Sequence, residues 1–185
     1  MPTDPAAQVQ STTVRVGAPT RLIIGGLAVL VFSAGLIVDQ LTKSWALQSL
    51  ADGSEVQLLP GISLRLAFNP GMAFGLGSSI GPAAAVAIIV FLAALSSWIC
   101  WNILRGPASR TLLLLAMVAA GGWGNIYDRI TRADSGPLSG TVVDMIAVEG
   151  FAIFNVADTL AVCGIVAWSA VNLFGRRAAR SEIET

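Results

Sequence analysis

Residues 22–38 (LIIGGLAVLVFSAGLIV) decide the fold class, because this run is free of charged side chains and ends directly at Asp39. A helix needs roughly 20 predominantly apolar residues to cross a membrane. Three later runs approach that length, at residues 82–104, 112–127 and 151–174. The sequence therefore predicts a mainly α membrane protein with four transmembrane helices, at about residues 22–41, 82–104, 111–129 and 152–174.

The composition supports a membrane protein. Of 185 residues, 55% are hydrophobic and only 12% are charged, whereas soluble domains carry about 25% charged residues. The formal net charge is zero, which gives no indication of a nucleic-acid partner, and none is expected. The chain has no histidine and no metal-ligand pattern, so we expect no metal and no cofactor. Carboxylates remain as the agents of any chemistry.

The arginines predict the orientation of the helices. Cytoplasmic loops of membrane proteins are enriched in lysine and arginine, and seven arginines flank four of the predicted helix ends: Arg15, Arg21, Arg105, Arg110, Arg176, Arg177 and Arg180. The acidic residues gather at the opposite ends. We therefore expect both termini in the cytoplasm and the acid-rich segments on the extracytoplasmic face of a cytoplasmic membrane.

The segments outside the helices differ in character. Residues 1–20 are polar and proline-containing, which predicts a disordered cytoplasmic tail, and residues 176–185 predict a basic one. Within residues 44–81, apolar and polar residues alternate at 62–66 after the turn dipeptide Pro60-Gly61, which predicts an outer β-hairpin or small sheet. Residues 131–150 are glycine-containing and short, and we expect a flexible flap. Residues 21–175 would then form one four-span domain.

Ionisable side chains at membrane level are by default a functional hypothesis. Asn125, Asp128 and Arg129 have the i, i+3, i+4 spacing that places them on one helix face. Asn155 and Asp158 share a face in the same way, one turn into the last span. In each case a purely structural role, as an interfacial ion pair or an interhelical hydrogen bond, is the alternative.

Three further positions carry polar groups near the predicted outer boundary. Asp144 lies alone among apolar residues, shortly before Asp158, so a folded flap would bring the two acids together; an exposed loop aspartate is the alternative. Asp39 and Lys43 have the spacing of an i, i+4 ion pair, for which a structural role is favoured. Asn69-Pro70-Gly71 ends the predicted strand and taken alone is a turn. The pattern as a whole indicates two aspartates converging at the membrane boundary.

A family resemblance rests on five motifs that occur in order along residues 22–175. They are Asp39-Gln40-Leu41-Thr42-Lys43, Asn69-Pro70-Gly71-Met72-Ala73-Phe74-Gly75, Gly124-Asn125-Ile126-Tyr127-Asp128-Arg129, Val142-Val143-Asp144 and Phe154-Asn155-Val156-Ala157-Asp158. This series closely resembles that of the bacterial lipoprotein signal peptidases, signal peptidase II.

The resemblance implies a membrane aspartyl endopeptidase that cleaves diacylglyceryl prolipoproteins just before the lipidated cysteine, in contact with membrane lipid. We expect the chain to act as a monomer. The resemblance implies that Asp144 and Asp158 are the catalytic pair. It also implies substrate-binding or site-supporting roles for other motif positions: Asn69, Gly71, Asn125, Arg129, Asn155, Asp39, Lys43 and Asp128.

Other classes of membrane protein remain as alternatives. A proton-coupled transporter also places acids at membrane level, but it usually shows internal repeats or acids near the midplane. A different intramembrane aspartyl protease would need a Gly-x-Gly-Asp partner after Tyr127-Asp128, which the sequence lacks. A Ser–Lys hydrolase built on Lys43-Ser44 would need adjacent helical residues to point the same way. A non-catalytic membrane scaffold is the last alternative.

Overall fold

The computed structural model describes residues 18–71, 82–106 and 109–181. It contains four helices and four strands in the order α1 (Ala18–Ser49), β1 (Val56–Leu59), β2 (Ile62–Asn69), α2 (Pro82–Leu104), α3 (Thr111–Thr131), β3 (Val142–Val148), β4 (Ala152–Phe154) and α4 (Val156–Ser181). Among the described residues, α1, α2 and α4 contain stretches that are long and apolar enough to cross a membrane. The predicted combination of a mainly helical membrane protein and a small sheet is confirmed.

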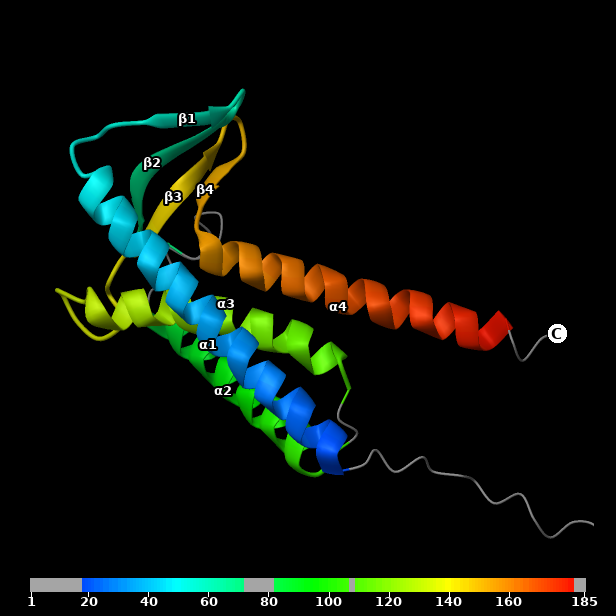
Figure 1. Cartoon of the computed structure of the whole chain (residues 1–185). Helices are drawn as coiled ribbons and strands as arrows, with labels where there is room; N and C mark the ends of the chain where they lie inside the picture. Colours follow the sequence, from blue (N-terminus) through cyan, green and yellow to red (C-terminus); the bar gives the residue numbers. More distant parts are fainter. Residues whose placement is uncertain (1–17, 72–81, 107–108, 182–185) are drawn as a thin grey trace, which may run out of the picture.

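Helices α1 and α2 run in a similar direction, α3 crosses them and runs more nearly along α4, and α4 begins at the end that carries the sheet (Figure 1). Helix α3 contacts each of the other three helices. Its contact with α4 is close because both helices carry glycines there: a side chain at Gly121 would collide with the backbone of Ala157, and one at Gly164 with the backbone of Leu114. Small residues allow such close approach of helices in membranes.

The sheet is antiparallel, with strand order β1-β2-β3-β4. The turn between β1 and β2 uses Gly61 at φ +79°, a conformation that glycine adopts without steric cost. The predicted hairpin is therefore present, but β3 and β4 extend it into a four-stranded sheet. Strand β3 pairs with β2 so that Asp144 lies opposite Ala67, and Ile146 lies opposite Phe154 of β4.

Residues 131–150 do not form one flexible flap, because β3 occupies Val142–Val148. Alternation does not reveal this strand, since its residues are buried on both sides along most of its length. Val143 and Met145 pack against Ala46 and Leu50 at the end of α1. This contact also explains why α1 continues to Ser49 rather than ending near residue 41.

The predicted start of the last helix at residue 152 is also wrong. Residues Ala152–Phe154 form β4, and α4 begins at Val156 and continues to Ser181, beyond the predicted end at residue 174. Aromatic and branched residues at 151–154 are compatible with either structure, and pairing with β3 decides the outcome. Residues 72–75 of the motif quoted above, and residues 1–17 and 182–185 of the predicted tails, lie outside the described residues.

Candidate active site

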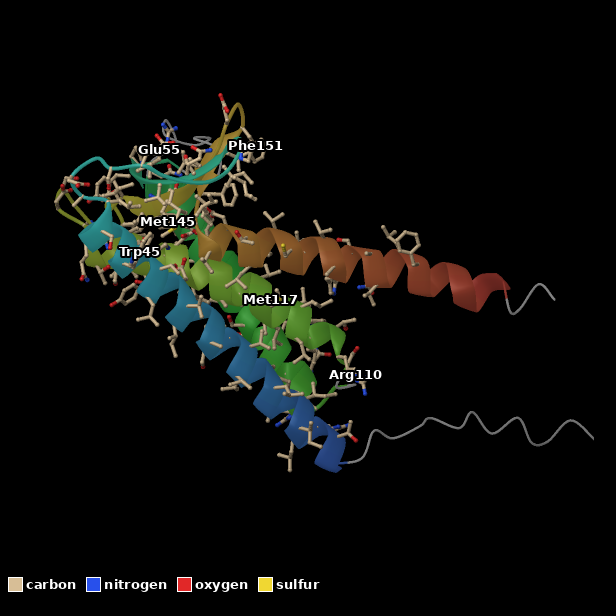
Figure 2. All side chains as sticks on the ribbon, turned by 45° about the horizontal axis from the view of Figure 1, so that its top comes forward. Trp45, Glu55, Arg110, Met117, Met145 and Phe151 are labelled. Carbon is tan, nitrogen blue, oxygen red and sulfur yellow. The ribbon has the colours of Figure 1, made fainter. Side chains whose placement is uncertain are left out.

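The ten predicted site residues come from five helices and strands and from two connecting segments, but they gather at one end of the helices. Asp39 and Lys43 lie in α1, and Asn125, Asp128 and Arg129 in the last turns of α3. Asn69 ends β2, Gly71 follows it, and Asp144 is at the centre of β3. Asn155 precedes α4, and Asp158 lies in its first turn. Met145, the neighbour of Asp144, is labelled where the sheet meets the helices (Figure 2).

Asp144 and Asp158 are joined through a single residue, Asn155. The Nδ2 of Asn155 donates to Asp144 Oδ1 at 2.7 Å, and its backbone N–H donates to Asp158 Oδ2 at 3.2 Å. The side chains of Asp144 and Asn155 are 2% and 0% exposed. The two carboxylates predicted to converge are therefore held around one buried amide.

A capping box fixes the position of Asp158. The Oδ1 of Asn155 accepts the backbone N–H of Asp158 at 2.9 Å, which reciprocates the bond from Asn155 N–H to the Asp158 carboxylate. Such reciprocal bonds satisfy two otherwise unpaired donors at a helix N-terminus. Asn155 thus begins α4 and orients an acid in the same motif.

Asn125 connects the carboxylate pair to a lysine. Its Nδ2 donates to Asp158 Oδ1 at 2.8 Å, while its Oδ1 accepts from Lys43 Nζ at 2.9 Å and from Asn155 Nδ2 at 3.1 Å. The lysine therefore fixes the orientation of the amide that contacts Asp158.

Lys43 lies between two buried carboxylates. Its Nζ is 2.9 Å from Asp39 Oδ2 and 3.2 Å from Asp128 Oδ2, and all three side chains are at most 1% exposed. Burying a charge is costly unless it is paired and hydrogen-bonded. We name Asp39, Lys43 and Asp128 the ion cluster.

The ion cluster also binds backbone groups of the elements that carry Asp144 and Asp158. Asp39 Oδ1 accepts the N–H of Ala157 in the first turn of α4 at 2.9 Å. Asp128 Oδ2 accepts the N–H of Val143, the residue before Asp144, at 3.0 Å. The cluster therefore positions α4 and β3 relative to α1 and α3.

Gln40 is a site residue that the sequence analysis did not select. Its Nε2 donates to Asp39 Oδ2 at 3.0 Å, Asp128 Oδ1 at 3.2 Å and the carbonyl of Gly124 at 3.3 Å. Its position beside Asp39 in the motif quoted above could have identified it, because an amide there can donate hydrogen bonds to both Asp39 and Asp128.

Arg129 binds carbonyl groups of two loops. Its guanidinium donates to the carbonyls of Pro70 and Gly140 at 3.4 and 3.3 Å and also to that of Gly71. Asn69 belongs to the same corner, because its Oδ1 accepts Gly71 N–H at 3.0 Å and its Nδ2 donates to Asp144 Oδ2 at 3.1 Å. Arg129 thus fixes the loop that presents Asn69 to Asp144.

The surroundings of Asp144 favour its protonated form. Burial raises the pKa of this carboxyl from 3.8 to about 6, and the nearby charge of Asp158 adds to the rise. Hydrogen bonds from Asn69 and Asn155 and the positive charge of Lys43 oppose it. Two carboxylates in one site resist simultaneous ionisation.

An apolar groove of about 360 Å³ opens beside Asp158. Asn69, Asp158 and Thr159 are its polar residues. The rest of its wall comes mainly from apolar residues of β4 and α4, including Ile153, Phe154 and Val162. Phe151, which also lines it, is labelled at the edge of the sheet (Figure 2). The groove can hold an apolar chain with one end at the carboxylate.

No three His, Cys, Asp or Glu side chains within the described ranges are arranged to hold a metal ion. The chemistry available here is that of two aspartates, three asparagine amides and a buried lysine.

Fold and site together define a helical membrane protein with paired carboxylates where its sheet meets its helices. The chain belongs to the signal peptidase II family, whose model, described as signal peptidase (SPase) II, matches residues 31–174. It is 39% identical over 143 residues to the lipoprotein signal peptidase of Bifidobacterium adolescentis, covering 72% of this chain and 70% of that protein. It is 31% identical over 169 residues to the lipoprotein signal peptidase of Rhodopseudomonas palustris, covering 84% and 96%.

Solved structures support the fold. One described as a bacterial membrane enzyme, at 2.3 Å resolution, has a TM-score of 0.64 and 21% identity, and covers 83% of this chain and 91% of its own. Another with the same description, at 1.9 Å, has a TM-score of 0.61 and 23% identity, covering 80% and 92%. The family assignment confirms the resemblance and disfavours the transporter and scaffold alternatives.

Proposed function

We propose that this chain is a membrane aspartyl endopeptidase that removes the signal peptide from diacylglyceryl prolipoproteins, cutting immediately before the lipidated cysteine. Membership of the signal peptidase II family supports the reaction. The observation that carries the residue assignment is the pair Asp144 and Asp158, both hydrogen-bonded to Asn155. Residues 21–175 would form the peptidase domain.

The pair would share one proton and act as base and acid together. The ionised carboxylate takes a proton from water, whose oxygen attacks the scissile carbonyl carbon, while the protonated carboxyl donates to the carbonyl oxygen. Collapse of the tetrahedral intermediate breaks the C–N bond, and the departing amine takes up a proton. The raised pKa of Asp144 supports a shared proton near neutral pH. The titration belongs to the pair, so neither acid is assigned the proton.

The neighbouring amides suit substrate positioning. Asn69, Asn125 and Asn155 all contact the catalytic carboxylates, and Asn69 and Asn125 each retain an amide N–H that a bound peptide or oxyanion can use. Arg129 and Gly71 would support the loop that carries Asn69. The ion cluster of Asp39, Lys43 and Asp128 would hold the scaffold.

The apolar groove beside Asp158 would receive the apolar part of the substrate. Its walls on β4 and α4 are exposed and apolar at Val162, which is 53% exposed, and Phe151. A groove open to lipid admits an acyl chain or signal-peptide helix directly from the bilayer. This arrangement explains why the carboxylates lie where the helices meet the sheet.

We further propose that all four helices cross the cytoplasmic membrane of a bacterium. Helix α3 carries Asn125, Asp128 and Arg129, but its polar groups are enclosed by protein, because α1, α2 and α4 all pack against it. A surrounded helix does not need a uniformly apolar surface. The arginines at the opposite end favour cytoplasmic termini and an extracytoplasmic site. The site is completed by one chain, which supports a monomer.

The decisive experiment is cleavage of a purified prolipoprotein with and without its diacylglyceryl group. The wild type should cleave only the lipidated form, before its cysteine. Asp144→Asn and Asp158→Asn should each lower kcat by roughly 10²–10⁴-fold or more, with circular dichroism unchanged. Asp134→Asn is the matched control, since Asp134 is an exposed loop acid, and it should cleave normally. Full activity of either site variant would refute the catalytic pair.

A further inference from the structure

A second groove lies on the other side of the helical bundle and belongs to no part of the site described above. It has a volume of about 340 Å³ and is formed by α1, α2 and α3. Its lining is apolar apart from Ser96 and includes Gly25, Phe32, Ile99 and Ala119. Ser96 is already bound by Trp123 Nε1 at 3.2 Å, so the groove offers an occupant only apolar contacts.

The groove opens toward the end of the helices that is far from the sheet. Gly25 and Leu104 line it there, and Phe32 lines it about 10 Å further along α1 at 1.5 Å per residue. A side chain at Gly25 would meet Ile103 Cγ2 at 2.8 Å. Ile103 in turn packs against the core pair of Ile24 and Leu112. Three helix ends therefore meet at the mouth of the groove.

Three arginines lie at or next to the ends of the helices that form this groove. Arg21 lies one turn before Gly25 on the same face of α1, Arg105 follows the last residue of α2, and Arg110 precedes α3. Arg110 is labelled at the end of the bundle opposite the sheet, far from Glu55 and Phe151 (Figure 2). The guanidinium of Arg105 lies 4.9 Å from the ring centroid of Trp101, a pairing typical of the membrane–water interface.

The mouth lacks negative charge in the part of the chain that the structure describes. The acidic residues there lie in the sheet, its loops or the helix turns next to it: Asp39, Asp52, Glu55, Asp128, Asp134, Asp144, Glu149 and Asp158. The buried Nε atoms of Arg21 and Arg132 have no hydrogen-bond partner among the described residues. Buried polar groups normally have a partner, so the Arg21 N–H at this end of the groove can donate to an acceptor supplied by a ligand.

We propose that this groove binds one anionic phospholipid, with its phosphate held by Arg21, Arg105 and Arg110 and one acyl chain lying between α1, α2 and α3. Guanidinium groups are suited to phosphate oxygens because they donate in a planar fork. The volume falls in the usual range for ligand sites, about 300–1,000 Å³. Apart from Ser96, the groove itself has no polar side chain for another class of ligand. This site is independent of the proposed peptidase chemistry.

Native mass spectrometry of the full-length protein in detergent tests the proposal. Phosphatidylglycerol and phosphatidylcholine with identical acyl chains are titrated separately, and phosphatidylglycerol should bind more tightly. Arg21→Gln combined with Arg105→Gln should weaken phosphatidylglycerol roughly 30-fold, from two surface arginine contacts. The control pair Arg65→Gln and Arg132→Gln removes the same charge near the sheet and should have little effect. Equal binding of both lipids, or equal effects of both pairs, would overturn the site.

A second measurement needs no substitution. Cys100 lines this groove and Cys163 lines the groove beside Asp158, and both are exposed. Phosphatidylglycerol should slow maleimide modification of Cys100, mapped by peptide mass, and leave Cys163 unchanged. Phosphatidylcholine should protect neither. Protection of both cysteines alike, or of neither by phosphatidylglycerol, would show that no lipid is held at the arginine end.

Discussion

Two pairs of aspartates lie close together in this molecule and differ in what lies between them. Asp39 and Asp128 are separated by the ammonium of Lys43, at 2.9 and 3.2 Å. Asp144 and Asp158 are connected only by neutral groups of Asn155. An ammonium between two carboxylates favours their charged forms, whereas two carboxylates in one site without a cation between them resist simultaneous ionisation. The first pair is therefore suited to holding the structure and the second to moving protons.

The structural pair should show the larger effect on folding. Lys43→Met leaves two buried carboxylates without their cation, and breaking a buried ion pair in this way costs about 3–5 kcal/mol. Unfolding of the purified protein in detergent, followed by circular dichroism, should show this loss. Arg65→Met, at an exposed position on β2, is the matched control. A Lys43→Met protein as stable as the wild type would remove the distinction between the pairs.

Substitution of Asp144 in the second pair should raise the free energy of unfolding, whereas substitution of Lys43 lowers it. Asp144 binds its proton more tightly in the folded protein, because its pKa is raised from 3.8 to about 6. Between these pH values the folded state carries more protons, so stability falls as pH rises. Asp144→Asn should therefore raise the free energy of unfolding at pH 7–8 by on the order of 1–3 kcal/mol, with no gain near pH 3.

A variant of the ion cluster provides the control for this prediction. Asp39→Asn in the ion cluster should destabilise at pH 7, since Asp39 holds both Lys43 and the N–H of Ala157. If Asp144→Asn and Asp39→Asn changed stability in the same direction at pH 7, the contrast between the pairs would be lost.

Asn155 allows activity and helix capping to be separated. Serine is a good N-cap residue, so Asn155→Ser should preserve the bond to Asp158 N–H and leave stability within about 1 kcal/mol. It removes the Nδ2 donor to Asp144. We expect kcat/KM to fall by roughly tenfold, equivalent to about 1.4 kcal/mol. Asn155→Ala, which also loses the cap, should lower stability as well. If both variants were as active as the wild type, Asn155 would have no positioning role.

The smallest effect is expected at Gln40. Gln40→Met keeps the side-chain length but removes the donor shared by Asp39 and Asp128. The loss should be about 1 kcal/mol of unfolding free energy, the net value of a typical hydrogen bond, with kcat unchanged. Gln48→Met, at an exposed position further along α1, should have no effect. A large fall in kcat would mean that the ion cluster takes part in the reaction.

The sequence predicted the helices well and the second half of the sheet poorly. Runs such as residues 82–104 can be recognised as helices from the local sequence, because an apolar segment of that length indicates a membrane helix whatever its neighbours are. Strand β3 does not, since Asp144 interrupts a buried segment whose pairing with β2 depends on residues far away in the chain. Residues 152–154 were expected to be helical, but pairing with β3 places them in strand β4.

The site residues could be selected from the sequence, but their grouping could not. Motif spacing indicated that Asp39 and Lys43 would pair, as they do. Nothing local indicated that Lys43 would also reach Asp128 and Asn125, or that Arg129 would bind loop carbonyls rather than an acid. Those contacts depend on how α1 and α3 pack, which only the folded structure defines.

The spacing of Asp39 and Lys43 within one helix has a consequence for biogenesis. When α1 leaves the ribosome, these two side chains can neutralise each other within a single turn, so the segment enters the translocon without net charge at that end. Asp128 is synthesised much later, with α3, and adds its negative charge only when the ammonium is already in place to receive it.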